Sequence, residues 1–172
     1  MRVMTKCALV ALISSAAAVP ALAASDTGTA TVTILRPLTV TKNTDLKFGT
    51  VVEPAAGSAT VTIDTTGTRT TTLVVGGAAV GVSDFTVAGE DGQAVTVSVP
   101  ATFPINNTSG PGSLTVTTTG NTTNVGSHNL AGGTGLGSGG TLDVKVGGQI
   151  TVLNTTNSGL YSGTFTVSAS YN

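Results

Sequence analysis

Residues 161–172 read Tyr-Ser-Gly-Thr-Phe-Thr-Val-Ser-Ala-Ser-Tyr-Asn. Aromatic, aliphatic or glycine residues occupy every odd position of this stretch, and small polar residues occupy every even position. Successive side chains of a strand point to opposite faces of a sheet, so this pattern is typical of a strand with one apolar and one polar face. The stretch therefore predicts that the chain folds as a β-protein.

The same alternation recurs along the chain, at residues 30–34, 59–63, 95–99, 114–117 and 142–146. Clusters of Gly, Asn, Asp, Ser and Pro separate these segments and are typical of turns. Short strands at this spacing predict one all-β domain over residues 24–172, an immunoglobulin-like two-sheet antiparallel sandwich. Seven apolar residues are expected in its core: Phe48, Val61, Ile63, Phe85, Val97, Phe165 and Val167.

Two loops are also predicted from composition. Residues 126–140 are rich in glycine and are expected to form a long mobile loop that carries His128 in solvent. Glu90 and Asp91 lie between Gly89 and Gly92, which indicates an exposed hairpin turn.

Residues 1–23 have the parts of a signal peptide. Arg2 and Lys6 form a basic start, an apolar run follows, and Ala21-Leu22-Ala23 is a cleavage signal after Pro20. Cleavage is expected between Ala23 and Ala24, which makes the protein exported. Cys7 precedes the apolar run rather than following it, so we reject a lipid anchor at this residue.

Composition argues against several classes of function. Charged residues make up 9% of the chain and aromatic residues 3%, against about 25% charged in ordinary domains. Beyond residue 23 there are five basic and eight acidic residues and no cysteine, so we expect no nucleic-acid partner and no disulfide. No later segment is long and apolar enough for a transmembrane span.

No pattern in the sequence indicates catalysis, a cofactor or a metal. His128 is the single histidine, so a Cys/His nucleophile or a zinc cluster cannot be assembled beyond residue 23. Residues 135–140 match G-x-G-x-x-G, but a strand pattern follows them where a phosphate-binding loop needs a helix. We therefore expect a protein that is not an enzyme and has no cofactor site.

Three motifs carry a resemblance to known families. The penultimate Tyr171 and Gly159, fourteenth from the end, resemble the C-terminal motif of chaperone–usher pilus subunits. Residues 45–51 are similar to a segment of archaic pilins and spore-coat-U-like domains. With the R-P-L-T-V-T-K stretch at 36–42, residues 29–172 resemble a family of secreted Gram-negative proteins defined as domain of unknown function 4402.

The resemblance to pilus subunits implies a sandwich that lacks its seventh strand, so that its last strand borders an open groove. A chaperone strand, and then a strand from the next subunit, would fill this groove. The implied partners are copies of this chain or related subunits, a periplasmic chaperone and an outer-membrane usher, first in the periplasm and then at the cell surface. The implied subunit-contact edge comprises Gly159, Tyr161, Gly163, Phe165, Val167, Ala169 and Tyr171.

Two questions stay open at this point. Ala30, Val32 and Ile34 are either the strand donated to a neighbour or part of the domain's own first strand, residues 30–40. In the second case only residues 24–29 remain, which reach about 20 Å and are too short to fill a groove, so this subunit would not donate. The function is either a structural subunit of a pilus-like appendage or a stand-alone surface sandwich used for adhesion, and the two differ in whether the edge at residues 161–171 is open.

Overall fold

The structure is a computed structural model that describes residues 23–172. The chain divides into two compact units, Met1–Thr33 and Ile34–Asn172, which are described separately. In the first unit, residues 23–33 form neither helix nor strand. The predicted signal peptide, with Cys7 inside it, lies outside the described residues apart from Ala23.

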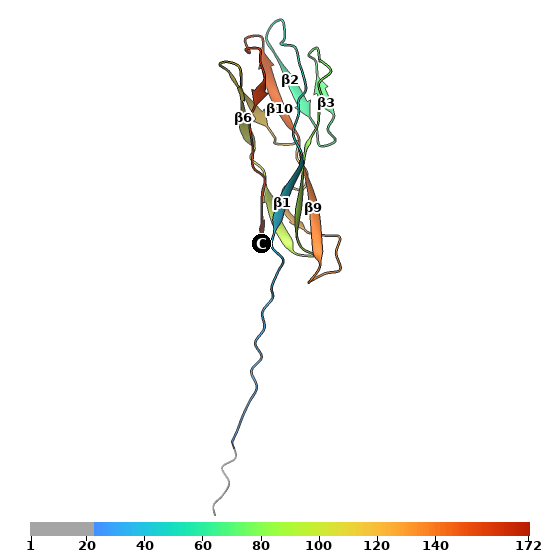
Figure 1. The fold of residues 1–172 in the computed structure, drawn as a ribbon, viewed down its shortest axis with the longest axis vertical. Helices are drawn as coiled ribbons and strands as arrows, with labels where there is room; N and C mark the ends of the chain where they lie inside the picture. The colour runs from blue at the N-terminus through green and yellow to red at the C-terminus, as the bar shows by residue number, and fades with distance from the viewer. Residues whose placement is uncertain (1–22) are drawn as a thin grey trace, which may run out of the picture. The chain divides into compact units, whose positions relative to one another are not determined.

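The second unit is built from strands alone, which confirms the all-β prediction (Figure 1). Residues 23–172 contain no helix, and their strands are β1 (Thr39–Thr44), β2 (Ser58–Ile63), β3 (Arg69–Thr71), β4 (Ser83–Glu90), β5 (Ala94–Ser98), β6 (Thr102–Asn107), β7 (Ser113–Thr117), β8 (Gly126–Asn129), β9 (Gly139–Val146), β10 (Gly148–Leu153), β11 (Tyr161–Ser162) and β12 (Ser168–Tyr171).

The alternating sequence pattern accounts for most of these strands. In β4, Phe85 and Val87 are buried, whereas Thr86 between them reaches the other face. Each fully buried valine contributes about 1.5–3 kcal/mol through the hydrophobic effect. The strands predicted around residues 59–63, 95–99, 114–117 and 142–146 are confirmed as β2, β5, β7 and β9.

Residues 30–34 form no strand in the described chain, whose first strand begins at Thr39, so they are not part of the domain's own first strand. Their role as a donated strand stays a prediction. A strand needs a hydrogen-bonded neighbour, and alternation in the sequence does not supply one.

All pairings between the described strands are antiparallel, and they form three sheets. Two sheets have three strands, in the orders β1-β4-β9 and β12-β5-β8, and the third has the order β11-β6-β7-β10-β2-β3. Gly147 alone separates β9 from β10, so this run of chain passes from one sheet into another. The fold is an antiparallel β-sandwich, and its immunoglobulin-like character stays a prediction.

One core of the sandwich is covered on both sides, and we call it the closed core. The sheets β1-β4-β9 and β12-β5-β8 enclose it, and its buried residues are Phe85, Val87, Val95, Val97, Leu130, Val144, Val146 and Val167.

A second core, which we call the open core, lies on the six-stranded sheet. Its buried residues are Val61, Phe103, Val116, Ile150 and Val152. Figure 1 shows the strands of this sheet in one half of the body, and β1 and β9 in the other.

Phe165 packs against both cores. Its ring stacks on Phe103 with centroids 4.7 Å apart and meets the edge of Phe85 at 5.8 Å. Of the seven predicted core residues, five are buried: Val61, Ile63, Phe85, Val97 and Val167. The other two, Phe48 and Phe165, are partly buried.

The prediction of one long loop over residues 126–140 is wrong in its first part. Residues 126–129 form β8, which pairs with β5, and Leu130 is buried in the closed core. His128 therefore lies on a strand and is half-buried. Among the residues described, no helix has the length and apolarity needed to cross a membrane.

Candidate subunit-contact site

A groove of about 1070 Å³ opens over the open core. Its walls come from residues 42–53, after the start of β1, and from residues 156–165, at the start of the C-terminal segment. Its floor is the apolar face of β6, β7 and β10, formed by Phe103, Ile105, Leu114, Val116, Ile150 and Val152.

Within residues 23–172, no second sheet covers the open core, and this leaves the groove open. The segment between β1 and β2 takes that place and contributes Leu46, Phe48 and Val51. Isolated bridges, Lys47 with Gly81 and Val51 with Val75, connect this segment to the rest of the chain. An apolar sheet face that is half covered is the kind of surface that an added strand can fill.

The C-terminal segment beside the groove runs along the edge of two sheets. β11 pairs with β6, and β12 pairs with β5, and each lies at the end of its sheet. The prediction of one continuous strand over residues 161–171 is wrong, because residues 163–167 belong to neither strand. The nearby Pro104 of β6 has no amide hydrogen to donate, which is a physical reason for the ladder to stop there.

The structure divides the seven predicted edge residues into two groups. Four of them line the groove: Gly159, Tyr161, Gly163 and Phe165. The other three pack on the closed core: Val167, Ala169 and Tyr171. Only the first half of the predicted edge therefore borders the groove.

The predicted donor residues are exposed. Val32 is 83% exposed and Ile34 is 82% exposed, and Ala30 is exposed as well. None of the three lies in a strand. The described chain thus combines an apolar groove without a covering strand and an alternating apolar segment without a partner.

A family model described as "Domain of unknown function (DUF4402)" matches residues 38–171. The chain belongs to this family. The matched DUF4402 domain contains every described strand, from β1 to β12, and leaves the predicted donor residues outside it. No curated protein and no solved structure matches the chain.

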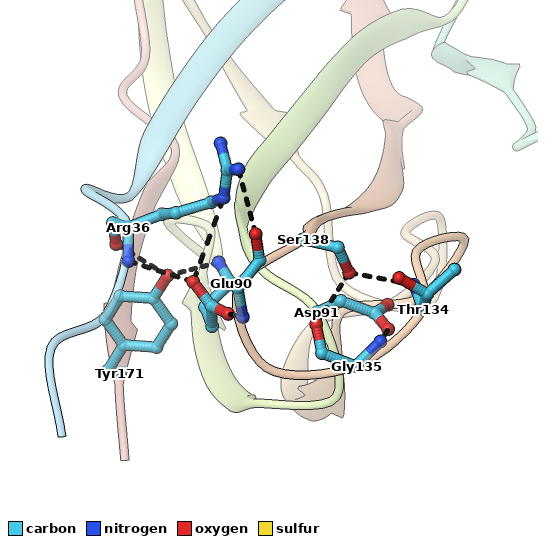
Figure 2. Close-up of polar contacts among 8 residues, drawn as sticks. Arg36, Glu90, Asp91, Thr134, Gly135, Ser138 and Tyr171 are labelled. Carbon is cyan, nitrogen blue, oxygen red and sulfur yellow. Dashed lines mark hydrogen bonds and ion pairs between the residues drawn. The ribbon is translucent and has the colours of Figure 1, made fainter.

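A polar network around the buried Glu90 lies where the chain enters the DUF4402 domain, and we call it the Arg36 lock (Figure 2). The Tyr171 hydroxyl accepts a hydrogen bond from the Glu90 amide at 2.6 Å and donates one to the Arg36 carbonyl at 3.0 Å. The Arg36 amide donates to Glu90 Oε2 at 3.1 Å, and Arg36 Nε lies 3.9 Å from the same oxygen. The Glu90 side chain is only 1% exposed.

Asp91 holds the glycine-rich loop that precedes β9. Its two carboxylate oxygens accept hydrogen bonds from the amides of Gly133, at 3.1 Å, and Gly135, at 2.7 Å. Ser138 Oγ accepts from the Thr134 amide at 2.8 Å and donates to the Gly135 carbonyl at 2.6 Å (Figure 2). The loop is thus tied to the end of β4 through its own backbone.

A turn does follow β4 at Asp91 and Gly92, but it joins strands of different sheets and is not the exposed hairpin turn that the sequence predicts. Glu90 and Asp91 are both buried, and the amide of Gly137 donates to the second oxygen of Glu90. Buried carboxylates need hydrogen-bond donors, and these come from a loop more than forty residues later in the chain. The sequence does contain a signal for the contact between these carboxylates and the loop. Two acidic residues are adjacent in a chain with few charges, and the loop is rich in glycines, whose backbone amides are accessible as donors.

Lys42 and Asp45 lie at the rim of the groove. Lys42 Nζ donates to Asp45 Oδ1 at 2.6 Å, and this hydrogen bond, reinforced by the lysine charge, lowers the pKa of the Asp45 carboxyl. Within residues 23–172, no group of three or more His, Cys, Asp or Glu side chains gathers in a metal-binding arrangement.

Proposed function

We propose that this DUF4402 protein is a structural subunit of a bacterial surface appendage, in which subunits are joined by strand exchange. The observation that carries the proposal is the groove over the open core. The occupant is the segment containing Ala30, Val32 and Ile34 of a second copy of the chain. Its apolar side chains would complete the open core.

The length of the segment supports this assignment. Because β1 begins at Thr39, residues 24–35 are free to donate. Twelve extended residues reach about 40 Å, and a typical strand spans about 17–20 Å. The donor segment is therefore long enough, whereas residues 24–29 alone would be too short if residues 30–40 formed the domain's own strand.

The chemistry of the segment also supports it. Burying Val32 and Ile34 contributes about 1.5–3 kcal/mol each, and the backbone adds a ladder of hydrogen bonds. Thr31 and Thr33 would point to the solvent face of the added strand. Such an assembly needs no disulfide, in keeping with the absence of cysteine from residues 24–172.

The proposal includes the route to the surface. The predicted signal peptide would direct the chain to the periplasm. There a chaperone would fill the groove until an outer-membrane usher exchanges the chaperone strand for the next subunit. These two partners rest on the resemblance of the C-terminal segment to chaperone–usher subunits.

The test replaces apolar donor side chains by charges. We expect Val32→Asp with Ile34→Asp to leave the exported protein monomeric, because two carboxylates cannot be buried in an apolar groove. The matched control is Thr31→Asp with Thr33→Asp, which adds the same charge on the opposite face and should still assemble. Sedimentation and electron microscopy of material sheared from cells measure the outcome.

A stand-alone surface sandwich used for adhesion is the second candidate. The closed core favours it, because this half of the body is already covered on both sides within one chain. If wild-type protein stays monomeric, or if both double variants assemble equally well, strand exchange through this segment is excluded and the stand-alone function is favoured.

A further inference from the structure

We propose that the Arg36 lock keeps the donor segment out of its own groove and so directs it to a second copy of the chain. This inference rests on the proposed strand exchange and adds a positioning role for Arg36, Glu90 and Tyr171. Because the donor segment and the groove belong to the same chain, insertion into its own groove competes with insertion into the groove of a second copy. The lock disfavours insertion into its own groove.

The backbone of Arg36 is held on both sides. Its amide donates to Glu90 Oε2 and its carbonyl accepts from the Tyr171 hydroxyl, while its guanidinium donates to the Gly137 carbonyl at 3.1 Å. The next residue, Pro37, has a fixed φ and no amide hydrogen. The chain direction at residues 36–37 is thus defined by contacts and by covalent geometry together.

Breaking the lock is costly because Glu90 is buried. If the Arg36 amide left, one oxygen of a carboxylate that is 1% exposed would lose its donor. The Tyr171 hydroxyl also holds the Glu90 amide, so the network would lose several contacts at once.

The lock and the groove lie in different parts of the body. The lock joins the start of β1 to the end of β12, against the closed core, and Figure 1 shows the C-terminus beside the start of β1. The groove lies between residues 42–53 and 156–165, over the open core. To fill its own groove, the donor segment would have to turn back directly before Arg36, whose amide and carbonyl are both held.

Twelve extended residues reach about 40 Å, so the length of the segment does not exclude such a turn. The lock disfavours the turn by fixing the Arg36 backbone from which the turn would start. A segment that enters at one end of the body and fills a groove at the other, in a second copy, makes a head-to-tail contact. Contacts of this kind repeat from copy to copy and produce filaments wherever their rotation does not close into a ring.

The experiment uses the mature chain with two added cysteines, Thr33→Cys on the solvent side of the segment and Leu160→Cys at the groove. Leu160 is 69% exposed, so this change removes little packing. Chains labelled with ¹⁴N and ¹⁵N are mixed before assembly and joined with a short bismaleimide. Mass spectrometry separates cross-links between chains, which mix the isotopes, from those within one chain, which do not.

The lock is tested with Tyr171→Phe, which removes the hydroxyl and keeps the ring. We expect the share of cross-links within one chain to rise on the order of fivefold, the effect of losing the one hydrogen bond by which this hydroxyl holds the Arg36 carbonyl. The matched control is Thr96→Val, which removes a hydroxyl that bonds the neighbouring Asn172 at 2.5 Å and leaves the lock intact. It should not change the share.

The outcomes separate the two proposals. The lock is overturned if the share of cross-links within one chain is equal in Tyr171→Phe and Thr96→Val. It is also overturned if the wild-type cross-links form mainly within one chain. Both results still leave groove filling in place. No specific cross-link of either kind overturns strand exchange itself. If circular dichroism shows that Tyr171→Phe does not fold, Pro37→Gly decides instead, because it frees the backbone without removing a hydrogen bond; an unchanged share there overturns the lock.

Discussion

At the scale of single residues, carboxylates organise several turns and ends of this protein. Asp64, after β2, accepts three hydrogen bonds on one oxygen, from the amide and hydroxyl of Thr66 and from the amide of Thr68, at 2.7–2.8 Å. The Thr66 hydroxyl is the main cause that lowers the pKa of Asp64 below its ordinary value of 3.8. Such an Asx-turn fixes the direction in which the chain enters β3.

This lowered pKa predicts a pH dependence of stability. A carboxyl whose pKa is lower in the folded state stabilises the fold above the unfolded pKa, and this contribution is lost as the pH falls through the folded value. We therefore expect wild type to be more stable than Asp64→Asn near neutral pH, and the difference to shrink below about pH 4. Urea unfolding at a series of pH values measures it.

The control for this prediction is Thr66→Val, which keeps the carboxyl and removes the main cause of the shift. The pKa of Asp64, followed by NMR, should rise toward its ordinary value in this variant. A stability difference between wild type and Asp64→Asn that is the same at pH 3 and pH 6 would contradict the prediction.

The burial and hydrogen-bond partners of single polar residues are the hardest features to predict from the sequence. Glu90 and Asp91 have glycine neighbours, so local reasoning places them in an exposed turn. Their burial depends on Arg36, on Tyr171 and on the glycine-rich loop, all of which are distant in the chain. The penultimate tyrosine was singled out by resemblance, but its hydroxyl bonds become visible only in the structure.

At the scale of elements, prediction succeeded where a strand has a partner in the chain. β2, β5, β7 and β9 follow local alternation, and each finds a neighbour. Residues 30–34 have the same pattern and form no strand. The groove could not be predicted in detail, because it depends on which strands leave one sheet face uncovered.

Gly163 provides a test at this scale. A Cβ at this position would collide with the Pro104 carbonyl and lie 3.1 Å from the Ile105 Cα of β6. Gly163→Ala should push the C-terminal segment away from β6 and lower the free energy of unfolding by about 1–3 kcal/mol. Gly110→Ala is the matched control, because a Cβ there meets nothing within 4 Å.

Chemical denaturation of both glycine variants measures the difference. The control should stay within about 0.5 kcal/mol of wild type. Equal stabilities of Gly163→Ala and wild type would mean that the segment shifts freely along β6, contrary to the close packing described here.

At the scale of the whole molecule, Phe165 connects the two cores of the sandwich. Phe165→Ala removes the stack on Phe103 and the edge contact with Phe85 together. We expect a loss of about 3 kcal/mol, at the lower end of the range for phenylalanine truncation because the ring is only partly buried. Equilibrium unfolding in urea measures it, and a loss below about 1 kcal/mol would contradict the role of this ring.

The unequal covering of the two cores also has a consequence for native-state fluctuations. Cooperative units that bury few apolar groups open at lower free energy than fully packed ones. Amide hydrogens of β4 and β9, paired over their whole length beside the closed core, should therefore exchange with solvent only in near-global unfolding. Those of β11 and the outer part of β6 should exchange through local opening. A strand placed in the groove would slow exchange there first, which makes hydrogen exchange a residue-by-residue report of occupancy.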